Sequence, residues 1–236
     1  SYDQWRNDNL TDRYQGVQFG YEEAGRYEDW EDIWSYPIYK DRDILPGDYK
    51  YEDWNGDGEI NSLDEHPFAF DQTPWMNFSL SFDGSYKNFD LSFLFQGTAM
   101  GSMQYQEPLY GIWGTNGGGT LTQYLDRWHP VDPSADPYDP ETDWVSGYYG
   151  YTGNYPFGNS DFNRVSTAYL RLKSIEAGYT LKPKQSSSMN VRVFANTYNL
   201  FTITGVRFVD PEHPDSDLGR LYPLSKTYTL GISASF

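Results

Sequence analysis

The last segment of the chain alternates between apolar and polar residues without interruption. Every second position is apolar, and hydroxyl residues or glycine lie between them: Tyr228, Leu230, Ile232, Ala234 and Phe236 against Thr227, Thr229, Gly231, Ser233 and Ser235. Successive side chains of a β-strand point to opposite faces, so this segment predicts a strand with one apolar face. A last strand that ends on an aromatic residue is typical of outer-membrane barrels, whose apolar band faces lipid.

The same period of two predicts further strands. They are Trp75–Phe82, Phe89–Gly97, Ala168–Leu181, Met189–Leu200 and, less clearly, Tyr14–Glu22. The alternation slips by one residue near Lys173–Ser174, which predicts a β-bulge in the strand that contains it. The turn over 83–87 contains Asp83-Gly84, a dipeptide favoured in hairpins, so we expect the first two of these strands to form a hairpin that turns there.

The connections between these strands alternate in length. Residues 83–87 and 182–188 are short, whereas about 26–74, 98–167 and 201–224 are long. Outer-membrane barrels join strands by short periplasmic turns and longer extracellular loops, and counting back from a periplasmic C-terminal end places all three long connections outside. A soluble β-sandwich is the alternative, but it explains neither this alternation nor so long a structureless loop.

We therefore predict an all-β fold. Residues 1–236 are expected to form an antiparallel transmembrane β-barrel segment of about six strands with long extracellular loops. The smallest single-chain barrel of this class has about eight strands, so we expect the C-terminal part of a larger barrel. The first ten residues have neither the basic start nor the apolar core of a signal peptide, so we expect either a mature chain or an internal fragment, and the small number of strands favours the fragment.

Composition excludes several classes of protein. The chain has 34 acidic and 17 basic residues, a balance that argues against nucleic acid as a partner. It has no cysteine, and no apolar run approaches the roughly 18 residues of a membrane helix. Aromatic residues make up 19% of the chain, a fraction that interfacial girdles and aromatic-rich ligand loops of a barrel would use.

One local motif predicts a metal site. Residues 53–64 match the spacing of an EF-hand calcium loop, with oxygen-bearing side chains at alternate positions, a glycine for the sharp turn and a backbone carbonyl after it. We expect Ca²⁺, with Mg²⁺ second, held by Asp53, Asn55, Asp57, Glu59 and Asp64. No amphipathic helix flanks the loop, so its expected role is to rigidify residues 26–74. The alternative is a loop of Asx turns that binds no metal.

Three stretches resemble the SusC-like TonB-dependent transporters of Bacteroidetes outer membranes. Residues 46–61 are similar to that family's PGD-K-D-NGDG-I segment, residues 169–181 to its YLRLK strand, and residues 199–231 to its NLFT … YP … Y-LG ending. The resemblance implies the C-terminal portion of a barrel of about 22 strands. It also implies a plug domain that this chain lacks, contact with TonB through that missing part, a SusD-like surface lipoprotein as partner, and location in the outer membrane.

The resemblance further implies import of oligosaccharides or, in some members, oligopeptides. Sugars bind flat aromatic faces and planar polar groups, and residues 98–167 are rich in both. Our substrate candidates are Trp113, Asn116, Tyr124, Asp126, Arg127, Trp128 and Tyr149. The alternative is that these aromatic residues pack the loop on itself or against the lipoprotein.

An enzyme is not expected. No nucleophile elbow, zinc motif or phosphate-binding loop occurs in the sequence. Glycan uptake by a transporter is therefore the leading hypothesis. A surface glycan-binding or structural barrel protein is the second, and a glycoside hydrolase, which needs two specifically placed carboxylates, is the third.

Overall fold

The structure is a computed structural model. It describes residues 16–39, 43–105, 122–151, 159–182, 189–212 and 224–235. These residues form two compact units. The sheet unit contains residues 72–102 and the described residues from 166 onward, and the loop unit contains residues 16–71 and 103–165 where described.

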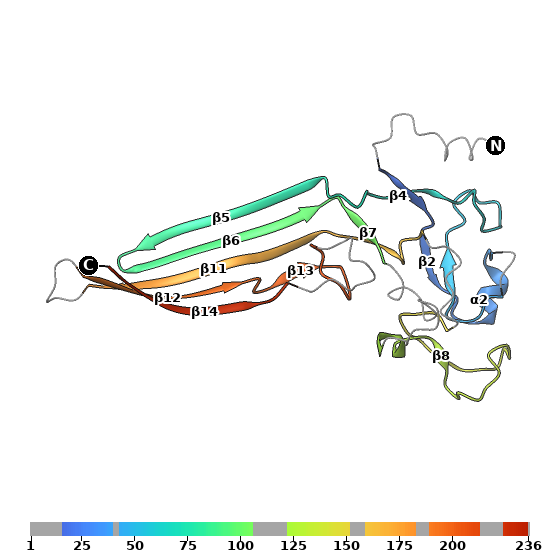
Figure 1. The fold of residues 1–236 in the computed structure, drawn as a ribbon. Helices are drawn as coiled ribbons and strands as arrows, with labels where there is room; N and C mark the ends of the chain where they lie inside the picture. The colour runs from blue at the N-terminus through green and yellow to red at the C-terminus, as the bar shows by residue number, and fades with distance from the viewer. Residues whose placement is uncertain are drawn as a thin grey trace, which may run out of the picture. The chain divides into compact units, whose positions relative to one another are not determined.

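The sheet unit is one antiparallel sheet of six strands. Its strands are β5 (Met76–Tyr86), β6 (Phe89–Ala99), β11 (Tyr169–Leu181), β12 (Asn190–Tyr198), β13 (Thr202–Thr204) and β14 (Thr227–Ser235). The long strands lie side by side in the order β14-β12-β11-β6-β5, and β13 pairs with β11 (Figure 1). The five strands predicted from clear alternation are therefore confirmed, as is the all-β antiparallel class.

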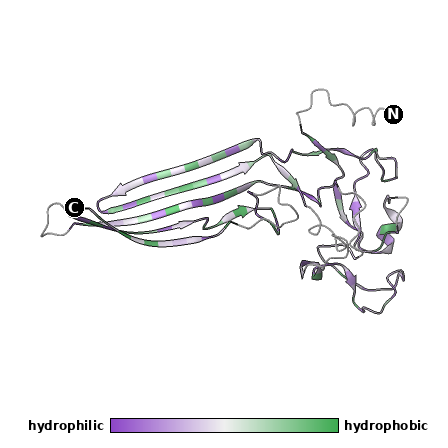
Figure 2. Cartoon of the chain, viewed as in Figure 1, coloured by the Kyte–Doolittle hydropathy of each residue, from purple (hydrophilic) through white to green (hydrophobic). Residues whose placement is uncertain are grey.

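The register of this sheet gives it two unlike faces. One row of directly paired residues across the five long strands is Tyr86, Phe89, Tyr179, Val193 and Ile232. A row on the opposite face is Asp83, Ser92, Glu176, Asn196 and Thr229. The alternation along the strands is visible in Figure 2. Many members of the apolar face remain solvent-exposed within the chain: Met76, Phe78, Leu80, Phe82, Leu91, Val193, Leu230 and Ile232. An exposed apolar surface of this kind marks a partner or a membrane.

The central strand β11 contains the bulge that the sequence predicts. Leu172 pairs with Phe95 of β6, and Ser174 pairs with the adjacent Leu94. Lys173 is therefore the inserted residue, with no partner of its own in this register. Such an insertion bends the strand and increases its local twist.

The strand on the other side of β11 bends at the same level. Asn199 has a φ of 53°, in the left-handed region, and its N–H donates to the carbonyl of Lys173 at 2.9 Å. Pairing then resumes, because Thr202–Thr204 lies against Tyr169–Arg171. The third long connection consequently begins after β13, later than the predicted residue 201.

The hairpin between β5 and β6 turns later than predicted. Tyr86 pairs with Phe89, so Lys87 and Asn88 form the turn and Asp83-Gly84 lies inside β5. Lys87 supplies the left-handed conformation, with a φ of 57°. Gly84 makes room for a neighbouring ring instead, since a Cβ there would lie 2.7 Å from Cζ of Phe82.

The weak strand expected over Tyr14–Glu22 does not belong to the six-stranded sheet. Its described part forms β1 (Gln18–Gly20), which pairs with β4 (His66–Ala69) in a separate two-stranded sheet of the loop unit. Assigning it as a sixth barrel strand was wrong. The sixth strand of the sheet is β13, which is too short for its alternation to be read from sequence.

The loop unit is built from short elements. Besides β1 and β4 these are β2 (Glu23–Arg26), α2 (Trp30–Ser35), β3 (Tyr49–Tyr51), η1 (Thr122–Leu125), β8 (His129–Pro130) and β9 (Trp144–Val145). Strand β2 pairs with β3, and β8 pairs with β9. Two further strands, β7 (Ser102–Gln104) and β10 (Arg164–Ser166), pair with each other. None of the helices in the described residues combines the length and apolar character needed to cross a membrane.

A buried ion cluster holds the segment after β13 against β11. Arg171 is 2% exposed; its Nη2 donates to Oδ1 of Asp210 at 2.7 Å, and its Nη1 lies 3.2 Å from Oε2 of Glu212. Lys173 Nζ reaches the same Glu212 at 2.9 Å, and the Tyr169 hydroxyl donates to it at 3.0 Å. Alternate residues of one strand thus converge on two carboxylates.

Replacing the buried guanidinium should destabilise the protein. We expect Arg171→Met to lower the free energy of unfolding by about 3 kcal/mol, because it leaves two largely buried carboxylates without their main counter-charge. Lys173→Met is the matched control; its side chain is 31% exposed, and the expected loss is below about 1 kcal/mol. Urea unfolding followed by tryptophan fluorescence measures both losses, and equal losses would contradict a dominant role for Arg171.

Candidate functional site

The hydrophobic core of the loop unit is made largely of tyrosines. Its buried members are Tyr21, Tyr49, Tyr51, Ile60, Tyr124, Tyr149 and Phe162. Ring centroids lie 4.4 Å apart for Tyr49 with Phe162 and for Tyr124 with Tyr149. Buried aromatic rings supply a large apolar area, while each phenol still needs a hydrogen-bond partner. Burial raises the pKa of Tyr149, so its phenol stays neutral, and Nε2 of Gln123 donates to it at 2.9 Å.

A guanidinium lies within this aromatic core. Cζ of Arg26 is 4.1 Å from the Tyr49 ring centroid and 4.8 Å from that of Phe162. Its Nη2 donates to the carbonyl of Tyr148 at 3.1 Å, and its Nη1 pairs with the carboxylate of Glu23. Burial lowers the pKa of Arg26, and the ring faces and the carboxylate offset the cost of desolvating its charge.

The predicted calcium loop is folded around its first carboxylate. Asp53 accepts hydrogen bonds from the backbone N–H groups of Gly56, Asp57 and Gly58 at 2.8, 3.1 and 2.8 Å. Gly58 has a φ of +87°, so glycine is needed at this turn, as the motif requires. The local chain path therefore agrees with the turn chemistry of residues 53–58.

The end of this loop is fixed by a buried acid. Asp64 is 1% exposed and accepts from the backbone N–H of Asn61 at 2.8 Å and of Asn55 at 3.4 Å. Its burial raises the pKa of its carboxyl group. The Nδ2 of Asn55 donates to Asp57, whose other carboxylate oxygen accepts from the N–H of Glu59 at 2.9 Å.

The five predicted metal ligands thus lie in one loop, and the side-chain oxygens of Asp53, Asn55, Asp57 and Asp64 accept hydrogen bonds from amides. Within the described ranges, no group of three or more His, Asp or Glu side chains is arranged to hold a metal ion. The Asx-turn alternative accounts for the hydrogen bonds of Asp53, Asp57 and Asp64. The Ca²⁺ site stays a prediction.

Two of the substrate candidates are core residues. Tyr124 and Tyr149 are each 1% exposed, so their rings have no surface to offer a ligand. The alternative reading, that aromatic residues of loop 98–167 pack the loop on itself, describes both of them. Aromatic composition alone does not separate rings that form a core from rings that bind sugar. Trp113 and Asn116 lie outside the described residues.

The remaining three candidates join two chain segments. The carbonyl of Asp126 accepts from the N–H of Tyr149 at 3.1 Å, and Nη1 of Arg127 donates to the carbonyl of Tyr124 at 3.2 Å. The N–H of Trp128 donates to the carbonyl of Tyr149 at 2.8 Å. The structure therefore brings five of the seven candidates together, with Asp126 exposed and Arg127 and Trp128 half-buried.

Sequence reasoning missed a cavity on the loop unit. Its volume is about 700 Å³, and it is lined by residues 33–38 on one side and by Gly58 and Glu59 on the other. The signal that could have indicated it is Trp34, a tryptophan in an acidic run, which is 70% exposed. A second cavity, of about 360 Å³, is lined by the acidic residues of loop 131–143.

The polar face of the sheet unit contains a charged network. Arg192 pairs with Asp90 and, at 2.7 Å, with Oε1 of Glu176. Asn196 Nδ2 donates to the other oxygen of Glu176 at 3.2 Å. Gly178 leaves room for the guanidinium, since a Cβ there would lie 2.5 Å from Nε of Arg192. Arg192, Asp90 and Glu176 thus form one mutually paired cluster on this face.

Comparisons with known proteins give a consistent set of relatives. No protein-family profile matches the chain. A curated protein of Formosa agariphila, "TonB-dependent receptor P26", is 30% identical over 240 residues, which is 94% of this chain. "TonB-dependent receptor P3" of the same organism is 25% identical over 82% of this chain. The chain spans only 22% and 19% of the lengths of these two relatives.

Solved structures with a similar fold are peptide transporters. The structure named "RagAB peptide transporter" matches 92% of this chain with a TM-score of 0.57 and 21% identity, over 22% of its own length. The RagAB peptide importer in its "open-open" state matches 92% of this chain with a TM-score of 0.54 and 20% identity, again over 22% of its length. At these identities the likeness establishes the fold.

Truncation of a core tyrosine should act on stability. We expect Tyr149→Ala to lower the free energy of unfolding by about 4 kcal/mol, because it empties a fully buried aromatic site. Tyr149→Phe should cost only about 1 kcal/mol, since it loses the hydrogen bond from Gln123 and keeps the ring. Thermal or urea unfolding separates the two. An alanine variant as stable as the phenylalanine variant would contradict the core assignment.

Proposed function

Since this chain is a C-terminal portion of a TonB-dependent transporter, we propose that it forms part of the wall of an outer-membrane β-barrel that imports nutrient oligomers. The observation that carries the proposal is the two-faced sheet. Strands β5 and β6 are each 11 residues long, and a transmembrane β-strand needs about 9–11 residues. The exposed apolar rows would face lipid, and the polar rows would line the interior of the barrel.

The topology supports an extracellular position for the loop unit. The connection before β5 and the connection from β6 to β11 both leave the antiparallel sheet at the same end of its strands. The hairpin turn at Lys87–Asn88 lies at the opposite end of the strands. In outer-membrane barrels the long connections are extracellular and the short ones periplasmic, so we propose that the loop unit lies at the cell surface.

The proposed partners are the parts of the transporter outside this chain and the proteins that contact it. It spans about a fifth of its curated relatives, so the other barrel strands and the plug would come from the rest of the same transporter. Contact with TonB would go through that part, and a SusD-like surface lipoprotein is the proposed extracellular partner. Chemical catalysis is no part of the proposal, because the relatives are named as receptors and importers.

The cargo has two candidates. Oligosaccharides are the cargo predicted from the aromatic loop, and that prediction loses support because Tyr124 and Tyr149 are buried. Oligopeptides gain support from the solved relatives named as peptide transporters. We therefore propose oligopeptide cargo, with oligosaccharide as the alternative.

Mass spectrometry of material that co-purifies with the intact transporter tests the cargo. We expect short peptides released on denaturation and uptake of labelled peptides by cells that carry the transporter. Deletion of the gene should abolish that uptake. Co-purified glycans together with glycan-dependent growth would replace the peptide proposal by the oligosaccharide alternative, and the absence of either cargo and of any uptake would overturn the import function.

Calcium binding by residues 53–64 is a further part of the proposal. The turn glycine and the spacing of oxygen-bearing side chains support it, and Asp53, Asn55, Asp57, Glu59 and Asp64 would be the ligands. The ion would rigidify the loop between β3 and β4. Oxygen ligands of this kind favour Ca²⁺ over Mg²⁺ when the site is flexible.

Metal addition and removal test this part directly. We expect Ca²⁺ in large excess to raise the thermal midpoint of the transporter by a few degrees relative to EDTA, because a ligand that binds only the folded state stabilises it. Asp57→Asn should remove most of this shift. Asp132→Asn, an equal charge change in the acidic loop 131–143, should leave it intact. Identical midpoints in Ca²⁺ and EDTA would contradict a metal site.

A further inference from the structure

The end of the sheet that contains the β5–β6 turn has an exposed aromatic row on its apolar face. Tyr86, Phe89 and Tyr179 are directly paired across three strands and are 72%, 63% and 36% exposed. The ring centroids of Phe89 and Tyr179 lie 4.6 Å apart. Strand β12 begins and strand β14 ends at this same end (Figure 1). Tyrosine collects at membrane–water interfaces because its apolar ring has a polar tip, so the row is suited to the edge of a lipid layer.

An ammonium group lies beside this aromatic row. Nζ of Lys87 is 5.2 Å from the centroid of the Tyr86 ring, and the lysine side chain is exposed. Because Tyr86 belongs to the apolar face, this contact holds the ammonium group at the edge of that face. A lysine whose methylene stem lies along apolar surface while its charged head stays in water is typical of a membrane interface.

A second lysine lies at the end of the neighbouring strand β11. The backbone N–H of Thr180 donates to the carbonyl of Asn88 at 2.8 Å, so the β5–β6 turn is tied to the last residues of β11. Lys182 follows Thr180 by two residues and is exposed. Lys87 and Lys182 therefore flank this hydrogen bond, and two ammonium groups belong to the same end of the sheet.

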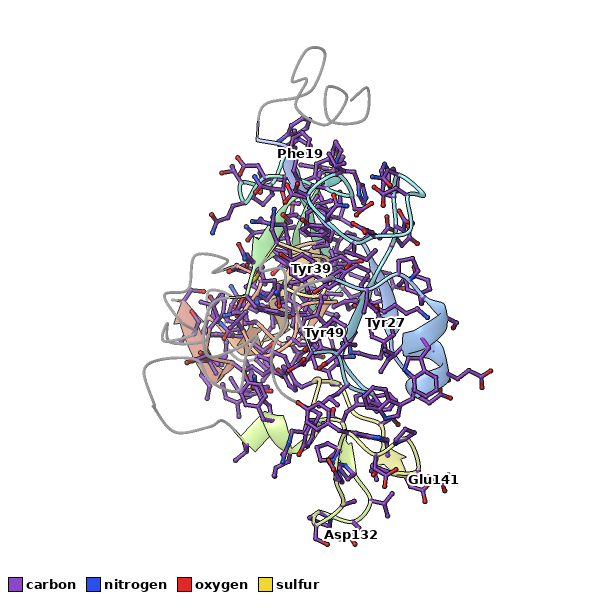
Figure 3. All side chains as sticks on the ribbon, turned by 90° about the vertical axis from the view of Figure 1, so that its right-hand side faces the viewer. Phe19, Tyr27, Tyr39, Tyr49, Asp132 and Glu141 are labelled. Carbon is purple, nitrogen blue, oxygen red and sulfur yellow. The ribbon has the colours of Figure 1, made fainter. Side chains whose placement is uncertain are left out.

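Positive charge is concentrated at this end although the chain is acidic. The turn residues 87–88 and 182–189 contain three lysines, two of which the structure describes, and no acidic residue. The whole chain has 34 acidic and 17 basic residues. Loop 131–143 of the loop unit, in which Asp132 and Glu141 are labelled in Figure 3, contains five acidic residues and no basic one. A local excess of lysine in so acidic a chain indicates an anionic partner at that end.

The acidic groups of the sheet do not neutralise the two lysines. Asp90 and Glu176, the acids of this part of the sheet, pair with Arg192 on the polar face. Within the described part of the chain, neither Lys87 nor Lys182 forms an ion pair. Both ammonium groups are therefore available to an anion that approaches along the apolar face.

We propose that Lys87 and Lys182 bind the phosphate of a glycerophospholipid whose acyl chains lie on the aromatic row. The two ammonium groups neutralise the phosphate, and the rings of Tyr86, Phe89 and Tyr179 pack against the upper methylene groups. The inference rests on the proposed barrel function, which puts this end of the sheet in the periplasmic leaflet. It goes further by assigning a lipid class, since a lipid with net negative charge is preferred over one whose headgroup already has its own cation.

Lipid binding to the purified, intact transporter tests the inference. Native mass spectrometry from detergent micelles measures binding of dioleoyl phosphatidylglycerol, dioleoyl phosphatidylcholine and dioleoylglycerol, which share their acyl chains and differ in the headgroup. We expect phosphatidylglycerol to bind most tightly. Lys87→Gln and Lys182→Gln should each weaken its binding about fivefold, the effect of one basic residue at an anionic lipid surface. Binding of dioleoylglycerol, which has no phosphate, should change little in either variant.

Two control variants separate the headgroup contact from charge and from acyl-chain packing. Lys226 is exposed and precedes β14 at the opposite end of the strands, so Lys226→Gln removes the same charge elsewhere and should change the affinity less than about twofold. Phe89→Ser removes an exposed ring and no charge, so it should weaken binding of all three lipids by a similar factor. Glycerol 3-phosphate, which has the phosphate without acyl chains, should not displace phosphatidylglycerol.

Several results would overturn the inference. Equal weakening by Lys226→Gln would show that only the overall charge matters, and equal affinity for the three lipids would show that no headgroup is recognised. Displacement by glycerol 3-phosphate would identify a soluble phosphate ligand instead of a lipid. If Lys87→Gln and Lys182→Gln have no effect while cells still take up cargo, the import function stands and only this inference fails. A transporter that binds none of these lipids and does not reach the outer membrane would overturn the barrel proposal itself.

Discussion

The structure depends first on the alternation of side chains along paired strands. In the sheet unit all five long strands share one phase, so that the row from Tyr86 to Ile232 is apolar and the row from Asp83 to Thr229 is polar. Hydrogen bonding fixes this register, and a slip of one residue would exchange the two faces. Water cannot cover the apolar side without cost, which is why an exposed face of this kind marks a partner or a membrane and why the charged residues of the sheet gather on the other side.

The loop unit has no long strands, and its segments pack around a buried core. This core consists mainly of phenol rings beside the guanidinium of Arg26, so that apolar area and hydrogen-bonding groups come from the same side chains. Two of the aromatic residues that suggested a sugar-binding surface, Tyr124 and Tyr149, are used here. Other aromatic residues of the loop unit stay exposed, and Trp34, at 70%, is the most exposed of the tryptophans that the structure describes.

The sequence was informative wherever the period of two ran long enough. It located the strands that became β5, β6, β11, β12 and β14, together with the bulge at Lys173. It indicated β1 only weakly and assigned it to the wrong sheet, and it missed β3, since three-residue strands show little periodicity and pair with segments far along the chain. The turn at Lys87–Asn88 was missed because Asp83-Gly84 has the better turn chemistry, while the packing of Phe82 requires that glycine inside the strand. The spacing of oxygen-bearing residues identified the candidate calcium loop. Aromatic composition, in contrast, did not reveal that Tyr124 is buried.

The inserted residue at position 173 changes which residues of β11 point to the apolar face of the sheet. Below it, the odd-numbered residues of β11, such as Ile175 and Tyr179, point to the apolar face; above it, the odd-numbered Arg171 belongs with the polar partner Gln96. Without the insertion, the guanidinium of Arg171 would project from the apolar face of the sheet. One extra amino acid therefore lets a single continuous strand keep its apolar residues on one face, although their numbers change from odd to even at the bulge.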